Sequence, residues 1–332
     1  MLRTLIRRAA VPIATVATRG AARIVAYHRF GRNGEFRRLP VEIFEQHLAF
    51  LKENYHVTTL SDIVSRLRAR EPFVPNSVVL TVDDGYRDFL TVAYPLLRKY
   101  QMPATLYVVP QFVDGQYMTW FDSLHEAAQS AAPGRYTFLM GSAVRTYELG
   151  SPESRNIAWE ALADHCLALP TEDRVEFVDD ARRVLNVPQV LNVPEQYASL
   201  SWDDVRGLDP ALVDIGSHTM THPILSRCRP ELQRFEIVES KRMLEQKMGR
   251  RVEAFCYPNG MPRDFDKHCV ELVAGAGYSS AVVMYGTLVE QGEDPFLMQR
   301  IGAADSLEMF QRQMDGVSHI ANRFRGKGAY GS

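Results

Sequence analysis

Two aspartates and two histidines have the side-chain types and the spacing of a catalytic metal site. Asp83 and Asp84 are adjacent at the end of an apolar run, and His218 and His222 lie four residues apart in the segment GSHTMTHP. Zinc and similar divalent ions accept imidazole nitrogen and carboxylate oxygen, and a catalytic site typically uses three protein ligands. Two histidines and one aspartate supply those ligands, which leaves the second aspartate free to act as a base.

Each pair also has a purely structural interpretation. An aspartate before a helix is a common N-cap, so one of the two carboxylates could serve only that purpose. The H-x-x-x-H spacing alone fits a pair of structural histidines about as well as it fits a metal site. We favour the metal site because Asp83 and Asp84 follow a fully apolar strand and precede Gly85. The spacing of His218 and His222 predicts that both rings lie on one side of a short helical turn.

Apolar runs predict the elements that would position these residues. Runs of strand length alternate with segments of helical period, as in a parallel sheet or barrel joined by helices. The predicted strands are 23–27, 77–82, 104–109, 213–216, 254–257 and 278–284. The predicted helices are 41–54, 86–100, 201–207 and 230–248. Six or seven strand and helix units favour a barrel over an open nucleotide-binding sheet.

The alternation breaks between Trp120 and Ser201, which we interpret as an insertion. Charged helical segments there surround a predicted hairpin, 136–149, with a glycine and a serine at its turn. The charged residues Arg174, Asp179, Asp180 and Arg182 are expected on a solvated helical face.

Polar residues gather at the predicted strand ends. In parallel α/β folds the chemistry collects at the carboxyl ends of the strands. The residues at such ends are His28, Asp83, Asp84, His218, His222 and Asn259. We therefore expect residues from distant parts of the chain to meet at one mouth of the barrel.

Composition limits the class of partner. The 332 residues, 46% of them hydrophobic, suffice for a large α/β domain with insertions. Lys and Arg total 38 against 40 for Asp and Glu, so the net charge gives no reason to expect nucleic acid. The four cysteines form no C-x-x-C pair and are expected to be reduced and mostly buried.

The N-terminal segment, 1–22, is predicted to be amphipathic. Arg3, Arg7 and Arg8 precede a modestly apolar stretch, but Pro12 and the lack of a clear cleavage site argue against a signal sequence. A short helix packed on the domain or lying on a membrane surface is the expected structure. No run is long enough to span a bilayer, so we expect a cytoplasmic protein with an option of peripheral membrane contact.

Three motifs in order resemble those of the polysaccharide deacetylase, or NodB-homology, family of carbohydrate esterases. They are TVDDG, HTMTH and FCYPNG, and the segments YHRF and WDDV agree with members that carry an N-terminal Y-H motif. The resemblance covers about residues 24–301 and implies a distorted (β/α)7-type barrel with a largely helical insertion. On this basis 23–305 is the barrel, 120–200 the insertion, and 306–332 a C-terminal helix and polar tail.

The same resemblance implies metal-dependent hydrolysis of an N-acyl group, usually acetyl on an N-acetylated sugar. The substrate would be polymeric or lipid-linked. Carried over by position, Asp84, His218 and His222 would bind a divalent ion, and Asp83 would be the general base. Zinc is the first choice of metal, and cobalt, nickel or manganese would suit the same ligands.

The remaining site residues follow from the resemblance and from two differences between this sequence and the family's motifs. The backbone N–H of Asn259 matches the family's oxyanion donor. The third motif lacks the usual base-orienting arginine, for which Arg300 is a candidate, with a solvated surface arginine as the alternative. No C-terminal L-x-H motif is found, so His28 is the predicted general acid, against an ordinary buried histidine. In this respect the chain resembles the poly-N-acetylglucosamine deacetylases.

Aromatic residues complete the predicted substrate-binding set. Trp120 would offer an apolar face to a sugar ring, with core packing as the alternative, and Asp122 beside it could line the same site. Tyr257, Asn259 and Arg300 are the other predicted substrate contacts.

Two other functions would use the same barrel. A deformylase or another amidohydrolase would keep the site but act on a different acyl group or scaffold. A non-catalytic carbohydrate-binding protein would have lost a ligand or the base. The intact set of two aspartates and two histidines argues against that last function.

Overall fold

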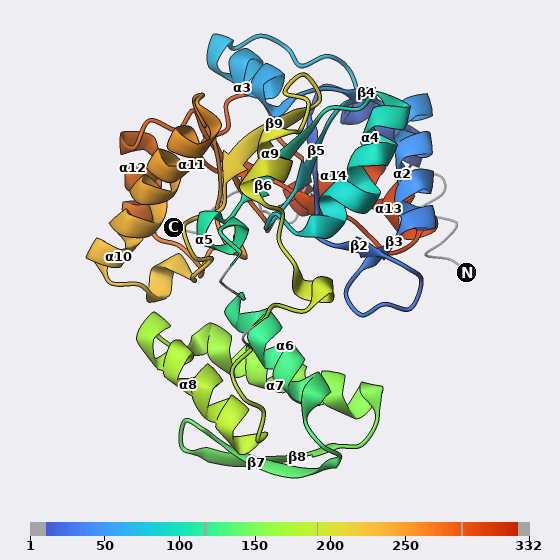
Figure 1. Ribbon diagram of the computed structural model, residues 1–332. Helices are drawn as coiled ribbons and strands as arrows, with labels where there is room; N and C mark the ends of the chain where they lie inside the picture. The colour runs from blue at the N-terminus through green and yellow to red at the C-terminus, as the bar shows by residue number, and fades with distance from the viewer. Residues whose placement is uncertain (1–10, 116–117, 191, 287, 325–332) are drawn as a thin grey trace.

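A parallel β-sheet rolled into a barrel forms the centre of the protein (Figure 1). The computed structural model describes residues 11–115, 118–190, 192–286 and 288–324. Across the sheet the strands are β12 (Met298–Gln299), β11 (Ser280–Val283), β10 (Ala254–Cys256), β9 (Val213–Ser217), β6 (Ala104–Val108), β5 (Ser77–Val82), β1 (Arg23–Tyr27) and β13 (Ile301–Gly302). A short strand, β4 (His56–Val57), also pairs with β5.

A single extended segment closes the barrel. Only Arg300 separates β12 from β13, and β12 pairs with β11 whereas β13 pairs with β1. The N–H of Arg300 donates to the Val283 carbonyl, and the N–H of Ala303 donates to the Ala26 carbonyl. Counted as one strand, β12 and β13 complete seven positions around the barrel within the described residues. The predicted (β/α)7-type barrel is confirmed.

Helices surround the barrel (Figure 1). They are α2 (Val41–Asn54), α3 (Leu60–Ala69), α4 (Tyr94–Tyr100), α5 (Pro110–Val113), α9 (Trp202–Arg206), α10 (Pro230–Arg234), α11 (Ser240–Met248), α12 (Lys267–Gly275), α13 (Leu307–Met314) and α14 (Val317–Phe324). Every residue of β1, β5 and β6 is buried. These strands are mostly apolar because one face fills the barrel and the other packs under helices.

Most predicted elements of the barrel are present. The predictions for 23–27, 41–54 and 77–82 match β1, α2 and β5 residue for residue. The predicted helix 86–100 begins with a π-helical turn, η1 (Phe89–Ala93), before α4. The predicted helix 230–248 is also interrupted by a π-helical turn, η4 (Phe235–Glu239), between α10 and α11.

The insertion forms a lobe that faces the barrel (Figure 1). Its elements are α6 (Trp120–Ser130), β7 (Gly134–Met140), β8 (Ala143–Leu149), α7 (Pro152–Ala168) and α8 (Thr171–Val184). The antiparallel strands β7 and β8 meet at a turn with Gly141 at φ 65°, where a residue without a Cβ is favoured. The lobe has an apolar core of its own, which includes Leu124, Trp159 and Leu162.

The prediction of a solvated charged face is wrong for two arginines of the lobe. Arg174 and Arg182 are each only 2% exposed. Arg182 pairs with Glu126 at 2.8 Å, and the Nε of Arg174 donates to the Cys166 carbonyl at 3.0 Å. The stems of the two arginines are therefore buried in the lobe, while their guanidinium groups bind backbone and carboxylate oxygens.

Predictions for the two chain ends are only partly covered by the described residues. Residues 11–17 are helical, whereas 1–10 and the tail 325–332 lie outside the described part of the chain. Across the described residues, no helix combines the length and apolar character needed to cross a membrane. The four cysteines are buried and free, as predicted.

Candidate active site

A cavity of about 930 Å³ lies where the carboxyl ends of the barrel strands face the insertion. The predicted strand-end residues all line this cavity, namely His28, Asp83, Asp84, His218, His222 and Asn259. Helix α6 contributes Trp120, Phe121 and Asp122 to the opposite wall. The barrel and the insertion therefore share one site.

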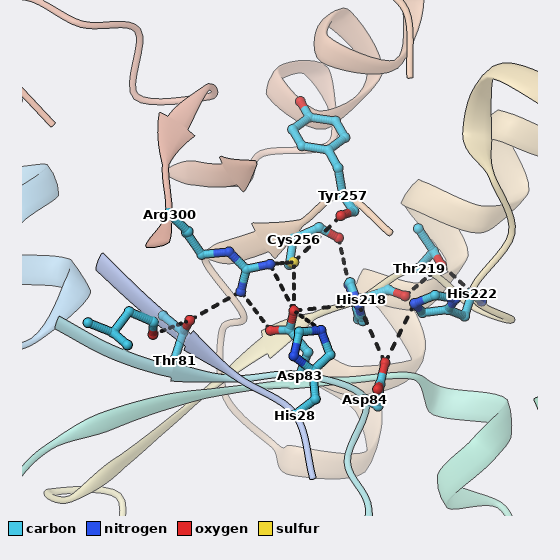
Figure 2. A network of polar contacts seen from close by, with 11 residues as sticks. His28, Thr81, Asp83, Asp84, His218, Thr219, His222, Cys256, Tyr257 and Arg300 are labelled. Carbon is cyan, nitrogen blue, oxygen red and sulfur yellow. Dashed lines mark hydrogen bonds and ion pairs between the residues drawn. The ribbon is translucent and has the colours of Figure 1, made fainter. Parts of the chain in front are cut away.

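The backbone after β5 points two adjacent carboxylates in different directions. The N–H of Asp83 continues the sheet by donating to the Tyr27 carbonyl at 2.9 Å. Asp84 and Gly85 then adopt left-handed conformations, with φ of 75° and 91°. A glycine is favoured at 85 because a side chain there would be strained. As a result Asp83 faces Arg300, and Asp84 faces the two histidines (Figure 2).

Asp83 is bound to Arg300 by two hydrogen bonds. The two terminal nitrogens of Arg300 donate to Oδ1 and Oδ2 of Asp83 at 2.7 and 2.8 Å. Burial would raise the pKa of Asp83, but the charges of Arg300, His28 and His218 and the hydrogen bonds from Arg300 outweigh it. The pKa is held well below its usual range, so Asp83 is an ionised carboxylate at neutral pH.

Arg300 is buried, so its interpretation as a solvated surface residue is wrong. Its side chain is 2% exposed and also donates to the Thr81 hydroxyl at 3.1 Å. Its position between β12 and β13 points it into the barrel, toward Asp83 (Figure 2). A buried arginine usually needs an anionic partner, and Asp83 provides it.

Arg300→Gln is expected to lower the free energy of unfolding by about 3–5 kcal/mol, because it leaves the buried Asp83 carboxylate without its counter-charge. Urea unfolding of the metal-free protein measures this. Because the pKa of Asp83 is lower in the folded protein than in the unfolded chain, ionised Asp83 stabilises the fold. This stabilisation is complete above the unfolded-state pKa of about 3.9, and it is lost as the pH falls below that value toward the folded-state pKa. The deficit of the variant should therefore shrink in acid.

Arg242→Gln is the matched control for this experiment. Arg242 forms an exposed ion pair with Glu239, and such a pair contributes at most about 1 kcal/mol. Equal stability losses in the two variants would contradict the buried pairing of Arg300.

Asp84, His218 and His222 form a group that could hold a metal ion. The Asp84 Oδ1 atom lies 3.6 Å from Nε2 of His218 and 3.5 Å from Nε2 of His222. The three candidate ligand atoms all lie within 4.8 Å of one another. Burial lowers the pKa of each histidine to about 4, so both imidazoles are neutral at physiological pH and have a lone pair to donate.

Two details fit a cation at this group. Nδ1 of His218 lies 2.9 Å from the Cys256 carbonyl, which can only accept, so Nδ1 carries the proton and Nε2 the lone pair. Asp84 Oδ1 is buried and has no hydrogen-bond partner among the described residues. Burial also raises the pKa of Asp84, as expected for a carboxylate that lacks a positive partner. A divalent cation would bind this oxygen and the Nε2 atoms of His218 and His222.

The two histidines lie in an irregular loop, so the predicted helical turn is wrong. Thr219 and His222 have left-handed φ values of 63° and 59°. The N–H of His222 donates to the Thr219 hydroxyl at 3.1 Å, and Pro223 disfavours a helical conformation for the residue before it. The loop brings the two imidazole rings to 4.7 Å between centroids.

His28 and Asn259 also line the cavity at the mouth of the barrel. His28 follows β1, and its Nε2 lies 3.5 Å from Asp83 Oδ2 with 47% of the side chain exposed. Its interpretation as an ordinary buried histidine is therefore wrong. Asn259 follows β10 in a left-handed conformation, with φ 57°, and lines the cavity.

The predicted aromatic contacts differ in location. Trp120 lines the cavity and also packs against the core of the insertion. Tyr257 does not line the cavity, because its ring is fully buried and stacks on Phe265 with centroids 4.3 Å apart. The prediction that the Tyr257 side chain contacts substrate is not supported by this placement.

Asp122 lies in the cavity wall beside Tyr86. The Tyr86 hydroxyl donates to Asp122 Oδ2 at 2.5 Å, and the Arg29 guanidinium lies 3.7 Å from the centre of the Tyr86 ring. Burial raises the pKa of Asp122 to about 6. A carboxyl group therefore lies in the wall formed by α6, next to the aromatic residues Tyr86, Trp120 and Phe121.

The contribution of α7 to the cavity was not predicted from the sequence. Glu160, Ala163, Asp164 and Leu167 line it from that helix. The available signal was their spacing, since residues three and four apart lie on one helical face. It could not be used without knowing that the insertion faces the barrel mouth.

Comparison with known families supports the resemblance seen in the motifs. A family model described as polysaccharide deacetylase matches residues 70–134 and 168–281, which is more than half of the chain. The chain therefore belongs to the polysaccharide deacetylase family. Its members are hydrolases of carbon–nitrogen bonds other than peptide bonds, the enzyme class predicted from the sequence. Residues 135–167, with the hairpin and most of α7, fall outside the match.

Curated relatives match over shorter stretches. The chain is 31% identical to YxkH of Bacillus subtilis (strain 168) over 107 residues, 32% of this chain and 38% of YxkH. It is 34% identical over 80 residues to the poly-β-1,6-N-acetyl-D-glucosamine N-deacetylase of Escherichia coli (strain K12), 24% of this chain and 12% of that protein. The matched region thus spans well under half the length of either relative.

A solved structure resembles the whole fold. The Streptococcus pyogenes deacetylase PplD, in complex with acetate, aligns with a TM-score of 0.59 at 19% identity. The alignment covers 89% of this chain and 98% of PplD. At that identity the likeness shows a shared fold, which includes the barrel described above.

Proposed function

We propose that this protein is a metal-dependent hydrolase that removes the N-acetyl group from an N-acetylated sugar or polysaccharide. The observation that carries the proposal is an ionised carboxylate, Asp83, directly beside the three-ligand group of Asp84, His218 and His222. The family membership agrees with this chemistry. A non-catalytic binding protein has no need of that arrangement.

In the proposed site, Asp84, His218 and His222 hold a divalent ion. Zinc is the first choice for two imidazoles and one carboxylate, and cobalt, nickel or manganese are alternatives. When bound, the ion supplies Lewis-acid polarisation of the amide carbonyl and lowers the pKa of water.

The protein's own groups then move the protons. Asp83 accepts the proton of the attacking water, while Arg300 keeps that carboxylate ionised and oriented. The backbone N–H of Asn259 donates to the carbonyl oxygen as negative charge develops there. His28 donates a proton to the leaving amine from its position 3.5 Å from Asp83.

The cavity suggests how a sugar would bind. The ring of Trp120 offers an apolar face to a pyranose, and Asp122 and the α7 carboxylates offer acceptors to hydroxyl groups. The relative from Escherichia coli acts, by its name, on poly-β-1,6-N-acetyl-D-glucosamine, which supports an N-acetylglucosamine polymer as the first candidate. Three further points stay predictions, namely a lipid-linked substrate, membrane contact through residues 1–22 and a cytoplasmic location.

Acetate release tests the proposal. Metal-stripped protein is incubated with N-acetylglucosamine oligomers of increasing length, with and without zinc, cobalt or manganese. Release that requires added metal and increases with oligomer length is the expected result. If the protein bound metal tightly but released acetate from no N-acetylated sugar, the site would instead act on another N-acyl group.

His28→Gln is expected to lower kcat about 100-fold or more on an N-acetylated sugar, because a positioned general acid contributes about 10²–10⁴-fold. The loss should be smaller on an activated aryl amide, whose leaving amine needs less protonation. The measurement is kcat on both substrates at saturating metal. His56→Gln, at an exposed position of β4, is the control. Equal losses on both substrates would remove His28 from the acid role.

A further inference from the structure

One helical segment holds the start and the middle of the loop that carries His218 and His222. At the start of the loop, the Ser217 hydroxyl donates to the Ser240 hydroxyl at 2.8 Å. Between the two histidines, the Glu236 carboxylate accepts from the backbone N–H groups of Met220 and Thr221, both at 2.8 Å. The Thr221 hydroxyl donates to the same carboxylate at 2.6 Å. Glu236 is 1% exposed, so water does not compete with these bonds.

The π-helical turn η4 accounts for the position of Glu236. Such a turn adds a residue to the helix and is frequent at functional sites. Here it places Glu236 and Ile237 inside together with Ser240. The carbonyl of Ile237 accepts from the Ser240 hydroxyl at 3.0 Å and from the Tyr278 hydroxyl at 3.1 Å. The irregular turn is therefore supported by specific buried hydrogen bonds.

The histidine loop needs such support. Thr219 and His222 are both left-handed, a conformation that residues with a Cβ disfavour. Without the Glu236 carboxylate, the backbone N–H groups of Met220 and Thr221 would also lose these two hydrogen bonds, and the loss of such a bond inside a protein costs free energy. Glu236 satisfies both groups at once, and thereby fixes the loop between the two imidazoles.

We propose that Glu236 is a positioning residue that sets the metal affinity of the site without contacting the metal. The inference rests on the proposed metal site of Asp84, His218 and His222. Groups behind metal ligands that fix ligand orientation commonly change metal affinity 10–100-fold when altered. Glu236 is the charged group among the described residues that binds the backbone between the two histidine ligands.

Glu236→Gln tests the proposal. Glutamine has the same shape, and its one oxygen can still accept from the N–H groups of Met220 and Thr221, which both bind the same carboxylate oxygen of Glu236. Glutamine carries no charge, however, so these charge-assisted hydrogen bonds become weaker neutral ones, and an N–H₂ group replaces the oxygen that accepts from the Thr221 hydroxyl. We expect zinc affinity, measured by competition with a chromophoric chelator, to fall about 10–100-fold. The visible absorption bands of the cobalt-loaded protein should also shift, because they report the geometry of the ligands.

Glu239→Gln is the matched control, since Glu239 lies in the same π-helical turn but pairs with Arg242 at the surface. Circular dichroism and the Tm of the metal-free proteins check that both variants fold. A Glu236→Gln protein that is folded and binds zinc and cobalt as the wild type does would overturn the inference and leave the proposed function intact. A wild type that binds none of these metals would overturn both.

Discussion

Asp83→Asn is expected to lower acetate release by about 10²–10⁴-fold while the protein still binds one equivalent of metal. Asparagine has the shape of aspartate but cannot accept a proton from water at neutral pH, and a positioned general base contributes a factor of that size. The candidate metal ligands Asp84, His218 and His222 are unchanged, so the metal content should be that of the wild type. Steady-state kinetics at saturating zinc and elemental analysis of the purified protein measure the two quantities.

Asp203→Asn is the control for this change. Asp203 is an exposed carboxylate in α9, so its loss should alter neither activity nor metal content. Asp83→Asn also removes the partner of Arg300, and a lower Tm is expected without loss of the fold. Turnover close to that of the wild type would remove Asp83 from the base role.

The barrel could be predicted because its strands have an unambiguous local signal. The runs 23–27 and 77–82 are largely apolar on both faces, which is typical of a buried parallel strand. Helix α2 was recognised by its apolar period, with Phe44, Leu48 and Leu51 buried on one face. The strands β12 and β13 are too short to give such a signal, so the segment that closes the barrel was not predicted.

The meeting of the candidate site residues at one place could be predicted from their positions at the ends of strands. Each of His28, Asp83 and Asn259 comes within three residues of a barrel strand, and a parallel barrel brings such positions to one mouth. Backbone detail could not be derived in this way. Thr219 and His222 are left-handed in a loop that is held by a local hydrogen bond to the Thr219 hydroxyl and by the Glu236 carboxylate. The Glu236 carboxylate comes from another element, so it could not be derived from the sequence of the loop.

Burial of charged residues was the least predictable property. Arg174, Arg182 and Arg300 are chemically ordinary arginines in the sequence, and arginine is usually exposed. Each is buried because a carboxylate or a set of carbonyl oxygens lies at the end of its side chain. Those partners are up to 217 positions away, as for Arg300 and Asp83. Sequence patterns of local period carry no information on such pairs.

His218→Ala is expected to weaken zinc binding by more than about 100-fold, since removal of a ligand should exceed the 10–100-fold cost of altering a group behind it. The wild type should gain about 2.7 kcal/mol of stability at zinc concentrations 100 times its Kd, and the variant should gain almost none. Chelator competition and the zinc dependence of Tm measure these effects. His268→Ala, at an exposed position of α12, should respond to zinc as the wild type does.

The two largest expected losses of activity are distinguished by their response to metal. In His218→Ala the proposed base Asp83 keeps its two hydrogen bonds to Arg300, so excess zinc should restore part of the acetate release. In Asp83→Asn the metal is already bound, so excess zinc should restore none. If both variants responded identically to zinc, the division of the two aspartates into a base and a ligand would be wrong, because that division alone predicts the difference.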